Sequence, residues 1–150
     1  MAEVLNPERP EKLSIVVFSG DFDKVHYALV MASAAAAIDT PVTLFFTMEG
    51  ARALMRPGVD NVAAWSTQPT SSGLETGADM NDTFVERGVA DFETLLSACR
   101  ELGVRFMVCE MGLKALDLKR GELRPDITIE IGGVVTFLND AHKDGAIIFI

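Results

Sequence analysis

Five short apolar runs recur along the chain, each bounded by polar or turn-forming residues. Unbroken runs rich in β-branched and aromatic residues are typical of strands buried on both faces of a parallel sheet. A strand or irregular segment is also expected near Val62–Trp65. The five runs predict strands at Leu13–Phe18, Val42–Phe46, Val104–Val108, Ile127–Ile131 and Ala146–Ile150.

Segments of helical character separate these strands. The clearest lies at Gly88–Leu102, where apolar residues recur every three or four positions and form a single stripe that includes Cys99. Gly103 is suited to end this helix, because glycine readily adopts the left-handed backbone of a helix C-terminus. Further helices are expected at Phe22–Ile38, at Glu49–Met55, at Glu110–Asp117, and from Gly132-Gly133 to about His142.

The alternation of strands and helices predicts the fold class. Strands that follow one another through helices are parallel and joined by right-handed crossovers. We therefore expect an α/β fold: a three-layer, doubly wound, mostly parallel sheet of about five strands. Residues 13–150 form a single predicted domain, preceded by a charged, proline-containing tail at 1–12 that we expect to be flexible. Gly58–Asp82 is polar and glycine-rich and is interpreted as a long loop of open role.

Composition and charge narrow the function. Apolar residues make up 49% of the chain and aromatic residues 7%, which indicates an aliphatic core. The net charge of −9, with no basic run, argues against nucleic acid or an anionic membrane as a partner. No stretch of about 18 apolar residues predicts a membrane span, and the charged N-terminus does not resemble a signal peptide. A reducing, cytoplasmic location with two free thiols is expected.

In folds of this class, sites form at the carboxyl ends of the strands. Three strand-to-helix turns qualify here, and they supply the candidate binding residues Gly20, Asp21, Lys24, Met111, Gly112, Gly132 and Gly133. Lys24 could meet an anion at the helix N-terminus, but capping of that helix, with Asp21 as the cap, is the favoured role of this turn, and close packing explains the paired glycines as well. No nucleotide-binding motif is present, and His26 and His142 lack ligand spacing, so neither a cofactor nor a metal is expected.

The two cysteines differ in placement. Cys99 lies on the apolar helical stripe and is interpreted as a buried structural residue. Cys109 directly follows a predicted strand and begins a helix, where unpaired backbone N–H groups favour a thiolate. The neighbouring Glu110 opposes thiolate formation, and a small residue filling a tight turn is the alternative interpretation. Because the strand between them spans about 16 Å, no disulfide between the cysteines is expected.

Several segments resemble known proteins. Glu101–Gly112, which contains Cys109, resembles the strand–Cys–helix segment of DsrE/DsrF-like sulfur-relay proteins. Ile129–Leu138 is similar to the Gly-Gly-Val segment of the DsrE-like branch often described as a peroxiredoxin family, and Phe18–Lys24 and Val42–Thr47 also fit this branch. The resemblance covers nearly the whole chain after Lys12.

The resemblance implies a homotrimer or larger homo-oligomer whose cysteine accepts sulfane sulfur or a thiosulfonate and passes it to a TusA-like or rhodanese-like carrier. By position, Cys109 takes that role. A serine often stands where this chain has Gly112, so a hydroxyl near the thiol is missing. This function needs an accessible thiol of low pKa. The alternative hypothesis is a non-catalytic assembly or small-ligand-binding module in which Cys109 is incidental.

Overall fold

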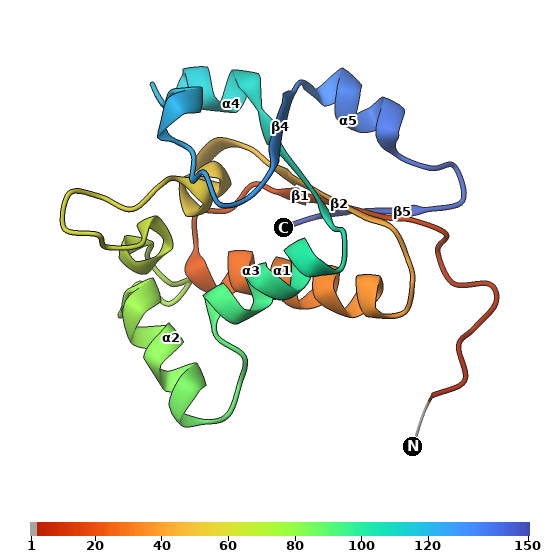
Figure 1. Ribbon diagram of the computed structural model, residues 1–150, viewed down its shortest axis with the longest axis horizontal. Coiled ribbons are helices and arrows are strands. Elements are labelled where there is room, and N and C mark those ends of the chain that lie inside the picture. Colours follow the sequence, from red (N-terminus) through yellow and green to blue (C-terminus); the bar gives the residue numbers. More distant parts are fainter. Residues whose placement is uncertain (1–2) are drawn as a thin grey trace.

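A computed structural model describes residues 3–150 as one parallel sheet between two layers of helices (Figure 1). The strand order is β4-β3-β2-β1-β5, and every pair is parallel. The predicted α/β class and the five predicted strands are therefore confirmed. The strands are β1 (Leu13–Val17), β2 (Val42–Phe46), β3 (Arg105–Cys109), β4 (Ile129–Gly132) and β5 (Ala146–Phe149).

Helices cover the two faces of the sheet unequally. Helices α1 (Phe22–Ala37) and α3 (Phe92–Glu101) lie on one face, and the short α4 (Glu110–Ala115) and α5 (Val134–Asp140) lie on the other (Figure 1). The large core lies on the α1 and α3 side and takes alternate strand residues such as Phe106 and Val108. A second, much smaller cluster lies on the other side and consists of Phe45, Met107, Cys109 and Phe137, with Val16 packed against it.

The segment between β2 and α3 departs most from the sequence prediction. It holds the 3₁₀ turns η1 (Met48–Leu54) and η2 (Ala64–Thr67) and the helix α2 (Gly77–Glu86). Helix α2 begins inside the predicted polar loop, because Thr76 and Asp79 form a capping box at its start. Of the strand or irregular segment expected near Val62–Trp65, the strand does not form: the chain there is irregular and enters η2, where the Trp65 ring stacks on Phe92 with centroids 5.0 Å apart.

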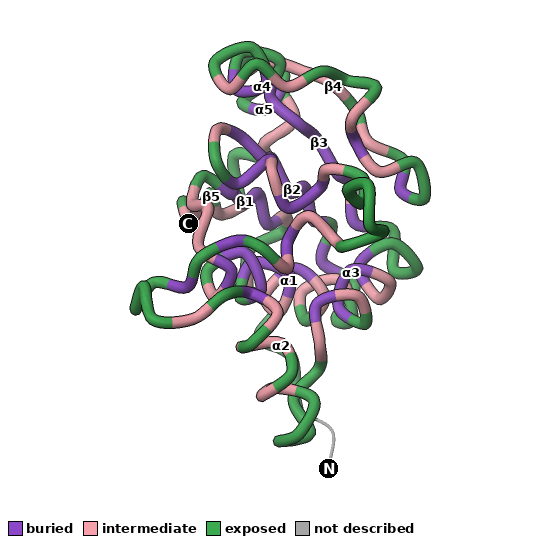
Figure 2. The backbone as a smooth tube through the Cα atoms, turned by 90° about the vertical axis from the view of Figure 1, so that its left-hand side faces the viewer, coloured by how far each residue is buried: buried purple, intermediate pink, exposed green. Residues whose placement is uncertain are grey.

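The tail before β1 contacts the domain at several points. The Lys12 ammonium donates to the Asp140 carboxylate at 2.7 Å, and Arg9 donates to the Ile38 carbonyl at 3.4 Å. Figure 2 shows the strands β2 and β3 buried in the interior, whereas the outer turns of α2 are exposed. Within residues 3–150 no helix combines the length and the apolar character needed to cross a bilayer.

Candidate functional site

Cys109 is the last residue of β3 and the N-cap of α4, as the sequence predicted. Its side chain makes no capping hydrogen bond, and it lies on the α5 face of the sheet beside Met107 and Phe137. Gly132 is its partner on β4. The residue is 0% exposed, so the accessible thiol that a sulfur carrier needs is not present in this conformation. The physical reason is that α5 folds back over the end of β3, and its Phe137 ring closes the cluster.

Helix α5 is held to the sheet by few contacts. Phe137 is its one buried residue, and its ring stacks on Phe45 with centroids 4.8 Å apart. At the end of the helix, Asp140 accepts hydrogen bonds from Thr43 and from Lys12, both at 2.7 Å, and pairs with Arg105. Burial raises the pKa of the Asp140 carboxyl, but the hydrogen bonds from Lys12 and Thr43 outweigh it and hold that pKa below its usual value. The Phe137 ring and the Asp140 carboxylate thus hold α5, which covers Cys109, against the sheet.

Cys99 occupies the opposite side of the sheet. It is fully buried in the large core, and its thiol donates to the Leu29 carbonyl at 3.6 Å. Burial raises the pKa of Cys99 to about 12, which leaves a protonated and unreactive thiol near neutral pH. Both cysteines are free and belong to different core clusters. This placement agrees with a structural role for Cys99.

Two of the three groups of candidate binding residues meet along η1. At the end of β1, Gly20 packs so tightly against Glu49 that an added Cβ would lie 2.7 Å from the Glu49 Cβ. At the start of α4, a Cβ on Gly112 would lie 2.7 Å from the Met48 nitrogen and 2.8 Å from the Thr47 hydroxyl oxygen. Consecutive residues of η1 therefore separate the two groups. The serine expected from the family resemblance has no room at position 112 in this chain.

The β1 group presents little free positive charge. Asp21 is the N-cap of α1 but makes no side-chain capping bond, and it pairs instead with the exposed Lys24 at 3.4 Å. Gly20 and Lys24 line an open depression of about 720 Å³ together with the aromatic pair Phe18 and Phe149, whose ring centroids are 5.2 Å apart. This depression suits an apolar contact better than a small anion.

The glycines near β4 serve packing. A Cβ on Gly132 would lie 3.2 Å from the Met107 sulfur and 3.3 Å from Thr136 of α5, so the glycine allows α5 to approach the sheet. Gly133 is the N-cap of α5 and has open space around it, and Met111 is largely exposed beside the end of β3. Of the binding residues predicted from sequence, Met111, Gly112 and Gly132 lie nearest to Cys109 in the chain or by strand pairing.

Three residues around the end of β3 carried no functional signal in the sequence: Thr47, Met48 and Phe137. Met48 adopts the left-handed backbone with φ of 50°, which is uncommon for a residue other than glycine and clusters at functional turns. Phe137 and Asp140 are three residues apart on α5, and this helical spacing was the available signal that they share a face.

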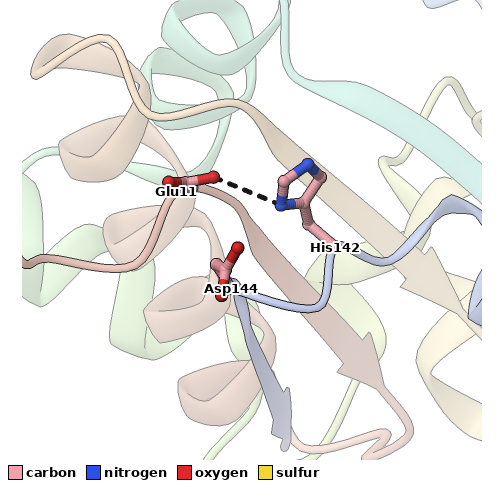
Figure 3. Close-up of side chains that lie close together, drawn as sticks. All are labelled: Glu11, His142 and Asp144. Atoms are coloured by element: carbon pink, nitrogen blue, oxygen red, sulfur yellow. Dashed lines mark ion pairs between the residues drawn. The ribbon is translucent and has the colours of Figure 1, made fainter.

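A group of metal-ligand types lies at the other end of the sheet. His142, Glu11 and Asp144 place one donor atom each within 4.8 Å of one another, and the His142 Nδ1 lies 3.4 Å from the Glu11 carboxylate (Figure 3). The sequence showed no such spacing, because pairing of the segments before β1 and β5 brings these residues together. All three side chains are exposed, and we assign them a surface ion-pairing role.

Comparison with known proteins places this geometry in a family. Residues 9–149 match the DsrE/DsrF/DrsH-like family. Among similar curated proteins, the uncharacterized protein YrkE of Bacillus subtilis is 29% identical, over 95% of this chain and 99% of its own length. The sulfur carrier protein DsrE2 of Allochromatium vinosum is 26% identical, over 93% of this chain and 98% of its own length.

Solved structures show the same fold at low sequence identity. The YchN protein of E. coli is 13% identical with a TM-score of 0.53, and MTH1491 of Methanobacterium thermoautotrophicum is 14% identical with a TM-score of 0.51. Each alignment covers 93% of this chain and 98% of the other. With the family match over residues 9–149, the chain belongs to the DsrE/DsrF/DrsH-like family, a sulfur-relay family.

Proposed function

We propose that this protein is a sulfur carrier that accepts sulfane sulfur or a thiosulfonate on Cys109 and passes it to a partner thiol. The observation that carries the proposal is the position of Cys109 at the carboxyl end of β3, in a chain similar to a sulfur carrier protein. In the first step the Cys109 thiolate attacks the outer sulfur of a persulfide, a sulfur–sulfur bond forms, and the donor leaves as its thiolate. In the second step the acceptor thiolate takes the same sulfur and Cys109 leaves as thiolate, so neither step needs an external oxidant.

Burial of Cys109 sets a condition on this chemistry. A thiol with no exposed surface reacts only when the cover moves, and α5 is the cover with the fewest attachments. We infer that a donor reaches Cys109 when Phe137 leaves its stack on Phe45. Gating of this kind protects a persulfide from unwanted thiols between the two transfers.

The test loads the reduced protein with a persulfidated carrier or with tetrathionate and measures intact mass. An adduct is expected on the wild type and on Cys99→Ala, because Cys99 lies in the other core cluster. No adduct is expected on Cys109→Ala. Transfer to an acceptor should then restore the original mass. Absence of any adduct on the wild type, or an equal adduct on Cys109→Ala, would reject the proposal.

We further propose that the partner is a TusA-like or rhodanese-like carrier in the cytoplasm, and that the chain forms a homotrimer or larger homo-oligomer. The support for self-association is an apolar patch on the side of the sheet that α5 leaves open, comprising Phe18, Ile147 and Phe149. These side chains are 45%, 53% and 67% exposed, and such contiguous patches mark interaction sites. Phe149→Asp should lower the mass measured by light scattering, whereas a monomeric wild type would refute the oligomer.

The second candidate function is a non-catalytic assembly or ligand-binding module, and the enclosure of Cys109 by Phe45, Met107 and Phe137 favours it. In that case Cys109 fills space in the smaller core cluster. Cys109→Ala would then lower stability without changing any sulfur transfer, and the loading experiment above separates the two functions.

A further inference from the structure

A cavity of about 300 Å³ opens between η1 and η2, beside the end of β1 and away from the Cys109 cluster. Met55, Ala64 and Pro69 give it an apolar wall, and its polar residues include Arg52, Glu49, Thr67 and Gln68. The volume falls at the lower end of the range for small-molecule sites. Ligands of parallel α/β folds bind outside the carboxyl ends of the strands, which is where this cavity lies.

Gln68 is the unusual member of this wall. It is 5% exposed, and both its amide nitrogen and its amide oxygen are buried without a hydrogen-bond partner. Across residues 3–150 no other buried side chain leaves both a donor and an acceptor unpaired. Unpaired buried polar groups destabilise a fold, so they are rare and call for a functional reason.

The backbone around Gln68 is firmly held. Its N–H donates to the Trp65 carbonyl at 3.2 Å, and its own carbonyl accepts from Gly77 at 2.7 Å. The carbonyl of Pro69 accepts from the N–H of Phe22 at the start of α1, at 2.8 Å. The unpaired amide is therefore carried on a fixed backbone segment, and no group among residues 3–150 supplies its partners.

Arg52 and Glu49 supply a second recognition element. The Arg52 Nε donates to the Glu49 carboxylate at 2.6 Å, and both side chains stay about half exposed at the cavity. A neighbouring cation and anion match a ligand that carries a carboxylate and an ammonium group on one carbon. A purely anionic ligand would be repelled by Glu49, and a purely cationic ligand would be repelled by Arg52.

We propose that this cavity binds an α-amino acid whose side chain carries an amide, of the glutamine or γ-glutamyl amide class. The ligand amide pairs its N–H with the Gln68 oxygen and its carbonyl with the Gln68 nitrogen, and the amino-acid end pairs with Arg52 and Glu49. Neither amide atom of Gln68 has exposed surface, so binding requires its side chain to turn into the cavity. The site is independent of sulfur chemistry at Cys109.

Calorimetric titration of the full chain with L-glutamine tests the proposal. L-glutamate, which lacks the amide donor, and L-norleucine, which lacks the amide, are expected to bind at least about tenfold more weakly. Gln68→Met keeps the length of the side chain but removes both polar atoms, and it should weaken glutamine binding by about 10- to 100-fold. No measurable glutamine binding to the wild type, or equal binding to Gln68→Met or of L-norleucine, would overturn it.

Thermal unfolding of the unliganded variants separates binding from folding. Gln68→Met should melt at the same or a higher temperature than the wild type, because it removes an unpaired buried amide. The control is Thr70→Val, two residues away, whose buried hydroxyl is already paired with Ser72 and Glu75. It should melt lower and bind glutamine unchanged. A lower melting temperature for Gln68→Met would show that its amide is satisfied in the folded chain, and would refute the premise.

Discussion

Removing the Phe137 ring should expose Cys109. The ring is 2% exposed, stacks on Phe45 at 4.8 Å and is the one side chain by which α5 enters the core. Phe137→Ala deletes this contact while the Asp140 ion pairs at the end of α5 remain. We expect α5 to open more often and the sheet to stay folded, because the large core on the other face is untouched.

The expected effect can be scaled from the packing. Truncating a buried phenylalanine to alanine costs about 3–5 kcal/mol. Phe137 belongs to a small cluster, so we take the lower end, and most of that loss falls on the local opening of α5. Since each 1.4 kcal/mol is a factor of ten in an equilibrium constant, a loss of about 3 kcal/mol raises the open population on the order of 100-fold.

Thiol labelling with Ellman's reagent measures this population when opening is fast relative to labelling. The experiment uses a Cys99→Ala background, so that Cys109 is the single thiol. Phe137→Ala should label on the order of 100-fold faster than its parent, and Asn139→Ala, an exposed change on the same helix, should label at the parental rate. Equal rates for folded Phe137→Ala and its parent would refute α5 as the cover.

Three further predictions concern stability. Burial lowers the pKa of His26 below 6.5, and its Nε2–H donates to the Ala90 carbonyl at 2.8 Å. The contribution of His26 to the free energy of unfolding should be fully present above pH 6.5 and should fall as the pH drops below it, because the unfolded chain then gains the proton before the folded chain does. Urea midpoints measured between about pH 7.5 and pH 5 should fall less for His26→Gln than for the wild type. Asp140→Asn should lower the free energy of unfolding by about 1–3 kcal/mol in urea titrations, since Lys12 and Arg105 lose their anion; Asp82→Asn, an exposed change on α2, should leave it nearly unchanged. Gly50→Ala should cost about 3 kcal/mol or more, because its Cβ would lie 2.2 Å from the Val17 carbonyl oxygen; Gly58→Ala, which meets no atom within 4 Å, is the control, and comparable melting points for the two would contradict the reasoning.

The sheet was predictable because its strands carry their signal locally. Runs such as Val42–Phe46 are apolar except for Thr43, since both faces of a central parallel strand are covered. Helix α2 was missed for the opposite reason: Gly77 and Asp79 begin it, and only Met80 and Phe84 mark its inner side. The Thr76–Asp79 capping box was the one signal that could have revealed it.

The candidate site was predictable in position but not in exposure. A residue that ends one strand and begins the next helix lies at the carboxyl edge of the sheet, and Cys109 does so. Its burial depends on Phe137 of α5, which is 28 positions later in the sequence and reaches the thiol only through the packing of the whole fold. The burial of Gln68 could not be predicted for a similar reason: a polar residue in a glycine-rich stretch is expected to be exposed, and only the folded structure shows that it is enclosed.

The strand order also bears on how the protein is made. Strand β1 pairs with β2 on one edge and with β5 on the other. Leu13 therefore finds its β5 partner, Ala146, only after nearly the whole chain has been synthesised. During synthesis the free edge of β1 remains open while almost the entire remaining chain is produced, and such edges recruit other chains. Newly made protein should therefore depend on chaperones until its last strand emerges, and slow translation of that region should increase aggregation.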